Sequence, residues 1–384
     1  MKVSAIIPLH NGKKFIYDCI NSLLTQTKIL HEILIVDDFS TDDGVEFVNK
    51  LLAKEQIKYR IISNQSNHGS AFSRNLGIRK AKGDFLLFLD QDDYLDPNFN
   101  KEIAEHLNST SNREIAGIYT SYYITDENKQ KTTEVCYCNI NSEEFLGHQF
   151  VRNRILSNSG TLIKKSILEE SGLYDESLKF SQDWDLWLRI GKVGVFSYLN
   201  KPLTFIRRHS NNTSAQIDGF LKDEIKILKK YSLEFIKDSI CKRNLPNYDN
   251  EIDFLSILLR LSDLEKLVSA MTHLEKKYPD HFEHYFYFGL LRYKEECMNE
   301  AIKYFEKVPS DNRFFYSAQN NLAAILILTG DLKSAEKILH EILIKKPDFQ
   351  DAVQNLKHLN SADTKPANLK ITTRHLRNSL YQYA

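Results

Sequence analysis

Short apolar runs alternate with amphipathic segments through the first third of the chain. The apolar runs, bounded by polar or turn-forming residues, predict strands at Val3–Leu9, Glu32–Val36, Tyr59–Ser63 and Asp84–Leu89. The segments between them place apolar residues at helical spacing and predict helices at Lys14–Thr25, Gly44–Lys54 and Ser70–Lys82. This alternation is typical of βαβ units and predicts an α/β fold with a mostly parallel, twisted sheet flanked by helices. Ligands of such sheets bind beyond the carboxyl ends of the strands.

From about residue 250 the pattern changes to nearly continuous helix with a 34-residue period. The period is visible in Leu267, Ala301 and Ala335, in Met271, Phe305 and Leu339, and in Gly289 and Ala323. Pro279 and Pro347, two periods apart, are placed to end helices. The pattern resembles tetratricopeptide repeats, with small residues where paired helices touch. An irregular helical bundle is the alternative.

These patterns predict four regions. Residues 1–218 form the α/β domain, 219–250 a helical connector, 251–360 the helical repeats and 361–384 a basic C-terminal tail. The tail carries Lys370, Arg374 and Arg377 and has no acidic residue after Lys365. A frayed, solvated end is the simpler interpretation of this tail, and contact with anionic lipid is the other.

Charge and composition exclude several classes of function. The chain has 51 basic and 51 acidic residues, so its formal net charge of +0 gives no electrostatic basis for binding nucleic acid. It has no apolar stretch of the ~20 residues that span a bilayer, and its first residues lack a signal-peptide pattern. We therefore expect a cytoplasmic protein, with peripheral contact at the inner face of the membrane as an open alternative.

Two acidic clusters directly follow predicted strands. Asp37 and Asp38 come after the strand that ends at Val36, and capping of the next helix would require only Asp42 or Thr41. A carboxylate in that position can accept hydrogen bonds from a nucleobase or a ribose. The second cluster is Asp90-Gln91-Asp92-Asp93. Residues two apart on an extended segment point the same way, so Asp90 and Asp92 can converge.

Crowded carboxylates repel one another unless a cation or solvent lies between them. Hard oxygen ligands suit Mg²⁺ or Mn²⁺, and such an ion would bind a diphosphate and stabilise its charge as it leaves. A solvated acidic turn is the alternative for Asp90, Asp92 and Asp93.

Two further motifs lie near residue 200. Asp183 falls in or before the first turn of a predicted helix, where the helix dipole favours its ionised form, so it can act as a general base or merely cap the helix. His209 ends the sequence Arg207-Arg208-His209, in which an imidazole can ligate a metal and an arginine can bind phosphate. A surface patch would have the same composition.

In their order, these motifs resemble the family 2 inverting glycosyltransferases of the GT-A fold. The motifs are VDDFSTD, SRNLGIRKAKGDFLLFLDQDD, SGTLIKK with GLYDESL, QDWDLWLRI and RRH, and the resemblance covers residues 2–212. It implies that Asp38 contacts uracil with Asp37 beside it, that Arg74 lines the donor site, and that Asp90 lies on the ribose side of the DXD metal motif.

The same resemblance implies that Asp92 and His209 contact the metal and that Asp183 is the catalytic base. The family usually has Glu-Asp where this chain has Gln182-Asp183. The implied cofactor is Mn²⁺ or Mg²⁺. The implied partners are a nucleotide-sugar donor, with UDP as the nucleotide, and a glycan, lipid-linked or protein acceptor, as in surface polysaccharide or glycoconjugate biosynthesis. The helical repeats would bind a protein partner or another copy of the chain.

Other enzyme classes fit less well. A pyrophosphorylase-type nucleotidyltransferase needs a glycine-rich loop after the first strand, where this chain has only Gly12, and no GxGxxG follows a strand as a dehydrogenase would require. Membrane-embedded synthases would need transmembrane helices. A binding scaffold with an inactive transferase domain remains the alternative from another class.

Overall fold

A computed structural model describes residues 1–109, 115–135, 140–155, 157–209, 217–360 and 369–374. The chain divides into two compact units, Met1–Arg243 and Asn244–Ala384. Arg377 and most of the predicted basic tail lie outside the described residues, whereas Lys370 and Arg374 lie within them.

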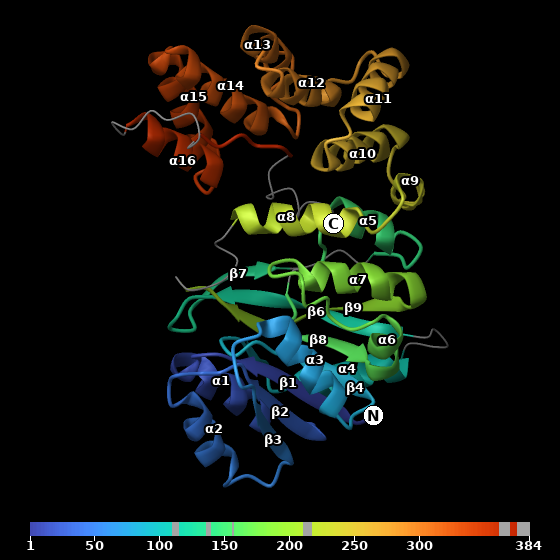
Figure 1. The fold of residues 1–384 in the computed structure, drawn as a ribbon, viewed down its shortest axis with the longest axis vertical. Helices are drawn as coiled ribbons and strands as arrows, with labels where there is room; N and C mark the ends of the chain where they lie inside the picture. Colours follow the sequence, from blue (N-terminus) through green and yellow to red (C-terminus); the bar gives the residue numbers. More distant parts are fainter. Residues whose placement is uncertain (110–114, 136–139, 156, 210–216, 361–368, 375–384) are drawn as a thin grey trace. The chain divides into compact units, whose positions relative to one another are not determined.

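The first unit is an α/β domain built on one sheet (Figure 1). Its strands are β1 (Val3–Leu9), β2 (Glu32–Asp37), β3 (Tyr59–Ser63), β4 (Phe85–Phe88), β5 (Tyr94–Leu95), β6 (Ile115–Thr125), β7 (Lys131–Val135), β8 (Thr161–Lys164) and β9 (Val195–Arg207). Its helices are α1 (Lys13–Leu24), α2 (Gly44–Leu52), α3 (Ser70–Lys80), α4 (Phe99–Ser109), α5 (Phe145–Val151), α6 (Lys165–Glu170), α7 (Gln182–Val193), α8 (Ile217–Leu228) and α9 (Leu233–Cys241). The seven elements predicted in the first third are all confirmed, with ends that differ by at most two residues.

The sheet is mixed. Its order is β3-β2-β1-β4-β8-β6-β9-β5, with β7 paired to β6. The strands from the first third, β3-β2-β1-β4, are parallel as expected, whereas β8 pairs antiparallel with both β4 and β6. Strands β6 and β9 are parallel as well, so the antiparallel pairings that the sequence did not predict are those made by β8, β5 and β7.

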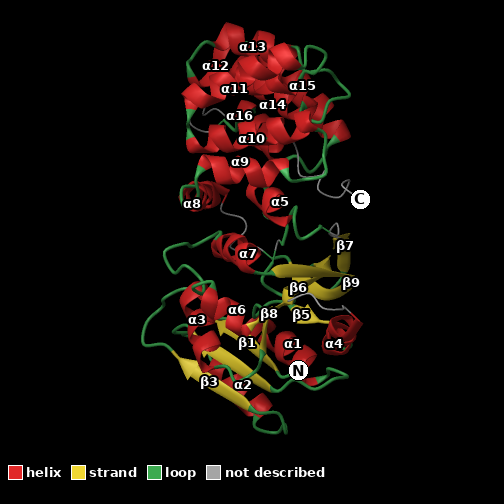
Figure 2. Ribbon diagram, turned by 90° about the vertical axis from the view of Figure 1, so that its right-hand side faces the viewer, coloured by secondary structure: helices red, strands yellow, loops and turns green. Residues whose placement is uncertain are grey.

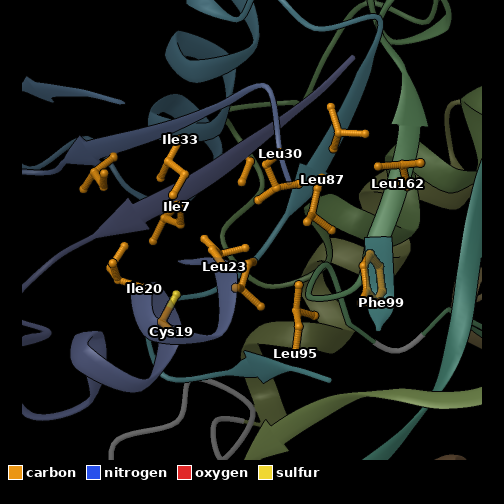
Figure 3. Close-up of a cluster of buried hydrophobic side chains, with 14 of the residues drawn as sticks. Ile7, Cys19, Ile20, Leu23, Leu30, Ile33, Leu87, Leu95, Phe99 and Leu162 are labelled. Carbon is orange, nitrogen blue, oxygen red and sulfur yellow. The ribbon is translucent and has the colours of Figure 1, made fainter. Parts of the chain in front are cut away.

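Helices cover both faces of the sheet (Figure 2). Alternate residues of β1 point to opposite faces. Ile7 belongs to an apolar cluster with residues of α1, α2 and α4, and Ile6 belongs to a second cluster with residues of α3, α6 and α7. Figure 3 shows the first of these cores, where Cys19, Ile20 and Leu23 of α1 meet Ile7 and Ile33 of the sheet. Burial on two faces makes the central strands rigid supports for the loops at their carboxyl ends.

Two helices, α8 and α9, lie largely within the predicted connector, residues 219–250. Helices α8 and α9 belong to Met1–Arg243, and the division between the units falls at residue 243, inside the range 219–250. A Cβ atom added to Gly147 of α5 would lie 2.2 Å from the backbone oxygen of Ser239 in α9. The absence of a side chain at Gly147 is therefore what allows α9 to pack closely on α5.

The second unit is helical. It contains α10 (Asn247–Leu261), α11 (Leu264–Lys277), α12 (Glu283–Lys294), α13 (Met298–Glu306), α14 (Phe315–Thr329), α15 (Leu332–Lys345) and α16 (Gln350–Leu359). Helices α11, α13 and α15 begin at residues 34 apart, and the periodic residues noted above are buried in them or in their neighbours. Gly330, at φ +91°, ends α14 in the left-handed conformation, and Asp331 caps α15 by accepting from Ser334 N.

No helix in the described part of the chain is both long enough and apolar enough to cross a membrane.

Candidate active site

The predicted site residues lie where parallel strands end and helices begin. Asp37 ends β2, Asp38 follows it, and Asp90 and Asp92 lie in the turn after β4. Asp183 lies in the first turn of α7, as predicted. This is the sheet edge at which α/β folds bind ligands.

Asp38 organises the loop that joins β3 to α3. Its carboxylate accepts hydrogen bonds from Asn64 Nδ2 at 2.8 Å, from His68 N at 2.9 Å and from Gly69 N at 2.7 Å. The side chain is 3% exposed, so these three donors replace the water that a charged group would otherwise need. No sequence pattern predicts these contacts, because Asn64 and His68 reach Asp38 only through the conformation of the loop.

The loop after β2 also has an unusual backbone. Phe39 adopts φ +63°, a region that bulky residues rarely occupy, and its ring is 51% exposed. Asp37 holds the turn by accepting from Ser40 N at 3.1 Å. Asp42 accepts from Gly44 N at 3.1 Å and from Lys13 N at 3.0 Å, so it serves the starts of both α2 and α1. Helix capping in this segment is therefore the work of Asp42, and Asp37 and Asp38 have other roles.

Gln91 joins the first strand's loop to the acidic turn. Its side chain accepts from His10 N at 2.7 Å and donates to His10 O at 3.0 Å, and the His10 ring lies 2.9 Å from the backbone oxygen of Asp38. A Cβ atom on Gly12 would lie 2.4 Å from Gln91 Oε1. The loop is thus shaped by contact with a glutamine amide, which differs from a glycine-rich phosphate loop.

A buried ion pair links α3 to the acidic turn. Arg74 Nη2 donates to Asp90 Oδ1 at 2.5 Å, and Arg74 is 4% exposed. Burial is the largest single influence and lowers the pKa of Arg74, but Asp90, Tyr174 and Asp183 together outweigh it, so the pKa is raised. The Nε and Nη1 atoms of Arg74 have no hydrogen-bond partner among the described residues. Buried donors of this kind need an acceptor, so a ligand oxygen would be stabilised there.

Asp92 faces the end of β9. His209 Nε2 lies 2.9 Å from Asp92 Oδ2, and the His209 ring stacks on Phe15 with centroids 4.8 Å apart. Burial and the neighbouring charge of Asp90 raise the pKa of Asp92. Asp90 and Asp92 therefore repel each other. Asp93 N donates a hydrogen bond to Asp90 O, so this segment is a turn and not the extended strand predicted from the sequence.

The carboxylate of Asp92 suits Mn²⁺ or Mg²⁺, whereas the facing imidazole is a transition-metal ligand, so the pair suits Mn²⁺ better than Mg²⁺. No group of three or more His, Cys, Asp or Glu side chains arranged to hold a metal occurs within the described ranges. Mg²⁺ is often held by one or two carboxylates together with substrate phosphates, so a pair of protein ligands fits a metal that also binds a diphosphate. Asp92 and His209 are the residues that would hold it.

Asp93 serves the framework. It is 4% exposed, accepts from Ser159 Oγ at 2.5 Å and accepts from Arg207 N at 2.8 Å. Ser159 Oγ in turn accepts from Asp90 N at 3.0 Å. Asp93 therefore fixes the acidic turn to the loop before β8 and to the end of β9.

The side chain of Arg207 is buried inside the first unit. It is 2% exposed, donates to Asp18 Oδ2 at 2.8 Å and lies 4.6 Å from the centroid of the Phe15 ring. The surface-patch interpretation of the Arg207-Arg208-His209 segment is wrong for Arg207, because its charge balances Asp18 inside the domain. Two residues of this segment contact the acidic turn: Arg207 through its backbone N–H to Asp93, and His209 through its ring to Asp92.

Asp183 lies within electrostatic range of the Arg74–Asp90 pair. Burial raises the pKa of Asp183 to about 6, against the lowering effects of the Trp184 N–H and of Arg74. Trp184 N donates to its Oδ1 at 2.7 Å, and Asn153 Nδ2 lies 3.5 Å from its Oδ2. The helix terminus favours the ionised form as predicted, but burial is the larger effect. A carboxyl with this pKa is still mostly ionised at pH 7.

The structure thus brings most of the predicted residues into one network. Asp90 contacts Arg74 and affects the pKa values of both Asp92 and Asp183, while Asp92 contacts His209. Asp38 joins this network indirectly, through His10 and Gln91.

Comparison with known proteins gives the family. The sequence profile described as glycosyl transferase family 2 matches residues 4–172. An uncharacterized glycosyltransferase of Rickettsia typhi is 30% identical over 253 residues, which cover 62% of this chain and 78% of that protein. The chain belongs to glycosyl transferase family 2.

Other family 2 relatives are longer. A chondroitin synthase of Pasteurella multocida is 28% identical over 254 residues, which are 66% of this chain and 25% of that protein. The chain spans about a quarter to a third of the length of several of the curated relatives it matches. The crystal structure of S. aureus TarS 1–349 in complex with UDP-GlcNAc has a TM-score of 0.52 and 16% identity, over 90% of this chain and 92% of that one. This likeness concerns the fold alone.

Proposed function

We propose that this chain is a metal-dependent inverting glycosyltransferase, which moves a sugar from a UDP-sugar to a hydroxyl group of an acceptor. The observation that carries the proposal is the network around Asp90, in which a buried arginine, a partly buried carboxyl and a carboxylate–imidazole pair meet at the carboxyl end of β4. Membership of glycosyl transferase family 2 supports the reaction class.

The donor nucleotide is assigned to the edge formed by the loops after β2 and β3. The exposed ring of Phe39 offers a stacking face beside Asp37 and Asp38. Because Asp38 already accepts three internal hydrogen bonds, we propose that it shapes the base pocket as well as contacting the base. The complex of TarS with UDP-GlcNAc, in a similar fold, supports UDP as the nucleotide.

The diphosphate is assigned to the space between Arg74, Asp92 and His209. Two buried nitrogen atoms of Arg74, Nε and Nη1, have no acceptor in the described parts of the chain, and their N–H groups suit phosphate oxygens. Asp92 and His209 would hold Mn²⁺ or Mg²⁺. A divalent ion there supplies charge that stabilises the departing nucleoside diphosphate.

Asp183 is assigned the proton transfer. Its carboxylate takes the proton of the acceptor hydroxyl while that oxygen bonds to the anomeric carbon and the bond from that carbon to the diphosphate breaks. Attack from the face opposite the leaving group inverts the anomeric centre. A pKa of about 6 is close to neutral pH, which suits a general base.

The acceptor is proposed to be a glycan or glycoconjugate of surface polysaccharide biosynthesis. The chondroitin synthase and hyaluronan synthase of Pasteurella multocida support this class, each with about two thirds of this chain aligned. For the second unit we propose tetratricopeptide-like repeats, which the 34-residue spacing of helix starts at Leu264, Met298 and Leu332 supports.

The test is a panel of nucleotide sugars with Mn²⁺ or Mg²⁺, in which release of the nucleoside diphosphate is measured with and without candidate acceptors. One UDP-sugar should be turned over in a metal-dependent way. Asp183→Asn should bind UDP as the wild type does, but its transfer rate should fall by about 10²–10⁴-fold. Asp43→Asn, which changes an exposed carboxylate, is the control and should keep the wild-type transfer rate. A protein that binds no UDP with either metal would instead be a scaffold with an inactive transferase domain.

A further inference from the structure

The segment Leu369–Arg374 lies along helices α14 and α16 of the second unit. Its bonded residues alternate, because Lys370, Thr372 and Arg374 contact the helices through backbone atoms. This alternation is the pattern of an extended chain, in which every second residue turns its backbone groups to the same side. The segment is therefore bound through its backbone, as an edge strand is bound by the neighbouring strand of a sheet.

Two asparagines bind this backbone through both amide atoms. Lys370 N donates to Asn355 Oδ1 at 2.7 Å and Asn355 Nδ2 donates to Lys370 O at 2.9 Å. Thr372 N donates to Asn321 Oδ1 at 2.7 Å and Asn321 Nδ2 donates to Thr372 O at 2.8 Å. Each carboxamide therefore replaces the peptide group of a neighbouring β-strand.

Two more side chains complete the backbone contacts. Asn320 Nδ2 donates to Lys370 O at 3.0 Å, and Ser317 Oγ donates to Arg374 O at 2.9 Å. We call the set Ser317, Asn320, Asn321, Asp351 and Asn355 the asparagine face. Backbone contacts of this kind do not depend on the side chains of the bound segment.

Two residues of the segment, Leu369 and Thr372, contact the helices through their side chains. Leu369 is 9% exposed and packs in the apolar cluster that contains Ile327 and Phe349. Thr372 Oγ1 donates to Asp351 Oδ2 at 2.7 Å and accepts from Asn320 Nδ2 at 3.0 Å. Thr373 is exposed. The asparagine face therefore selects a large apolar residue followed, three positions later, by a hydroxyl residue.

The polar character of this surface requires a reason. Ser317, Asn320, Asn321 and Asn355 are each 0% exposed when the segment is in place. Buried amides are unfavourable without partners, and apolar side chains would pack two helices at lower cost. The amides of Asn321 and Asn355 obtain those partners from the backbone of the segment. Their arrangement fits the binding of a polypeptide better than the packing of helices.

We propose that the asparagine face is a peptide-binding site, that Leu369–Arg374 is its built-in ligand, and that an extended segment of a partner protein replaces it. The partner's segment carries a large apolar residue three positions before a threonine or serine. All residues of the asparagine face belong to the second unit, and none of them is assigned a part in the sugar transfer.

A tethered ligand competes strongly with a free one. In the sequence only residues 360–368 separate α16 from the segment, and linking a ligand through so few residues gives an effective concentration of roughly 1 mM. A free peptide must overcome that concentration in the wild-type protein. Unseating the built-in segment should therefore strengthen binding of a free peptide by about tenfold or more.

The experiment uses the full chain and a fluorescent synthetic peptide of residues 366–377. Thr372→Pro removes the N–H that Asn321 accepts and unseats the segment, whereas Thr373→Ala alters an exposed neighbour and serves as the control. The Thr372→Pro protein should bind the peptide about tenfold or more tightly than the wild type or the control. Adding Asn321→Leu to Thr372→Pro should abolish this binding, with the same helical circular dichroism.

Variants of the peptide test which of its side chains the asparagine face recognises. Replacing the peptide's leucine at position 369 with aspartate, or its threonine at 372 with valine, should weaken binding about tenfold or more, whereas alanine at 373 should not. The proposal is overturned if the folded Thr372→Pro protein binds no more tightly than the wild type, or if the Asn321→Leu addition has no effect. A dimer of the wild-type protein that the free peptide dissociates would assign the segment to a second copy and overturn the partner-protein ligand.

Discussion

The Nε2 atom of His209 lies 2.9 Å from the Oδ2 atom of Asp92, although 117 residues separate them in the chain. The contact joins the turn after β4 to the end of β9 and leaves a carboxylate and an imidazole facing each other. If these two side chains hold a divalent ion, losing either one must weaken metal binding. Changes to outer-shell partners alone typically cost 10–100-fold in metal affinity.

We expect His209→Ala and Asp92→Asn each to raise the Mn²⁺ concentration for half-maximal activity by about tenfold or more. The measurement is a Mn²⁺ titration of nucleoside-diphosphate release. His106→Ala is the matched control, because this imidazole bonds Ser197 in another part of the same unit. An unchanged Mn²⁺ requirement in both site variants would exclude this pair as the metal ligands.

The pKa of Asp183 predicts two opposite dependences on pH. Burial raises this pKa from 3.8 to about 6, so the fraction of ionised base rises through pH 6 and the transfer rate should rise with it. The folded state binds the proton more tightly than the unfolded state, so this group stabilises the fold least when ionised. Its contribution to the free energy of unfolding should fall as pH rises from about 4 to 7.

Asp183→Asn removes this titration. Between pH 4 and pH 7 the free energy of unfolding of the Asp183→Asn protein should therefore rise relative to that of the wild type by on the order of 2–3 kcal/mol, at about 1.4 kcal/mol for each pKa unit. Urea unfolding of both proteins at the two pH values measures the difference. Parallel curves for the two proteins would mean that Asp183 has an ordinary pKa.

Phe39 holds a strained backbone beside the proposed base pocket. Asparagine adopts positive φ more readily than phenylalanine, so Phe39→Asn should keep or increase stability. If the ring stacks on the nucleobase, the same change should weaken UDP binding by about 5- to 100-fold, since base–aromatic stacking is worth ~1–3 kcal/mol. Calorimetry with UDP tests this, with Ile29→Asn as the control for an exposed apolar side chain before β2. Unchanged UDP affinity would remove Phe39 from the pocket.

Helix α9 should be necessary for the first unit to fold. Its Ile236 and Ile240 are fully buried, and it packs against Gly147. We expect the fragment 1–243 to be soluble and to unfold cooperatively, and the fragment 1–218 to aggregate or lose about 10 °C or more of Tm. Gly147→Ala in the longer fragment should cost about 1–3 kcal/mol through overpacking. Equal stability of the two fragments would instead favour the predicted boundary at residue 218.

The sequence predicts the features that depend on periodic spacing, but it does not predict which side chains form hydrogen bonds with one another. The strands and helices of the first third follow from apolar spacing, and Asp37, Asp38, Asp90 and Asp92 could be expected at the ligand edge because each follows a strand. The assignment of Asp38 to three donors of the loop that follows β3 could not, because it depends on the conformation of that loop. The same holds for Gln91, whose contact with His10 has no counterpart in any motif.

Burial is the other quantity that spacing does not give. Asp183 was expected in the first turn of a helix, and it lies there, but its pKa is decided by the protein around it. Arg207 was placed in a candidate phosphate-binding segment, whereas its guanidinium balances Asp18 in the interior. Asn320, Asn321 and Asn355 left no signal in the 34-residue pattern, because their role depends on a segment that binds across two helices.

The most direct test is a crystal of the protein with UDP and Mn²⁺, in which anomalous scattering locates the metal. Our account predicts Mn²⁺ within coordination distance of Asp92, His209 and the diphosphate, with Arg74 bonded to a phosphate oxygen and Asp183 facing the open side of the site. Mn²⁺ bound away from both Asp92 and His209, or UDP bound at a surface that Asp38, Asp92 and Asp183 do not share, would contradict it.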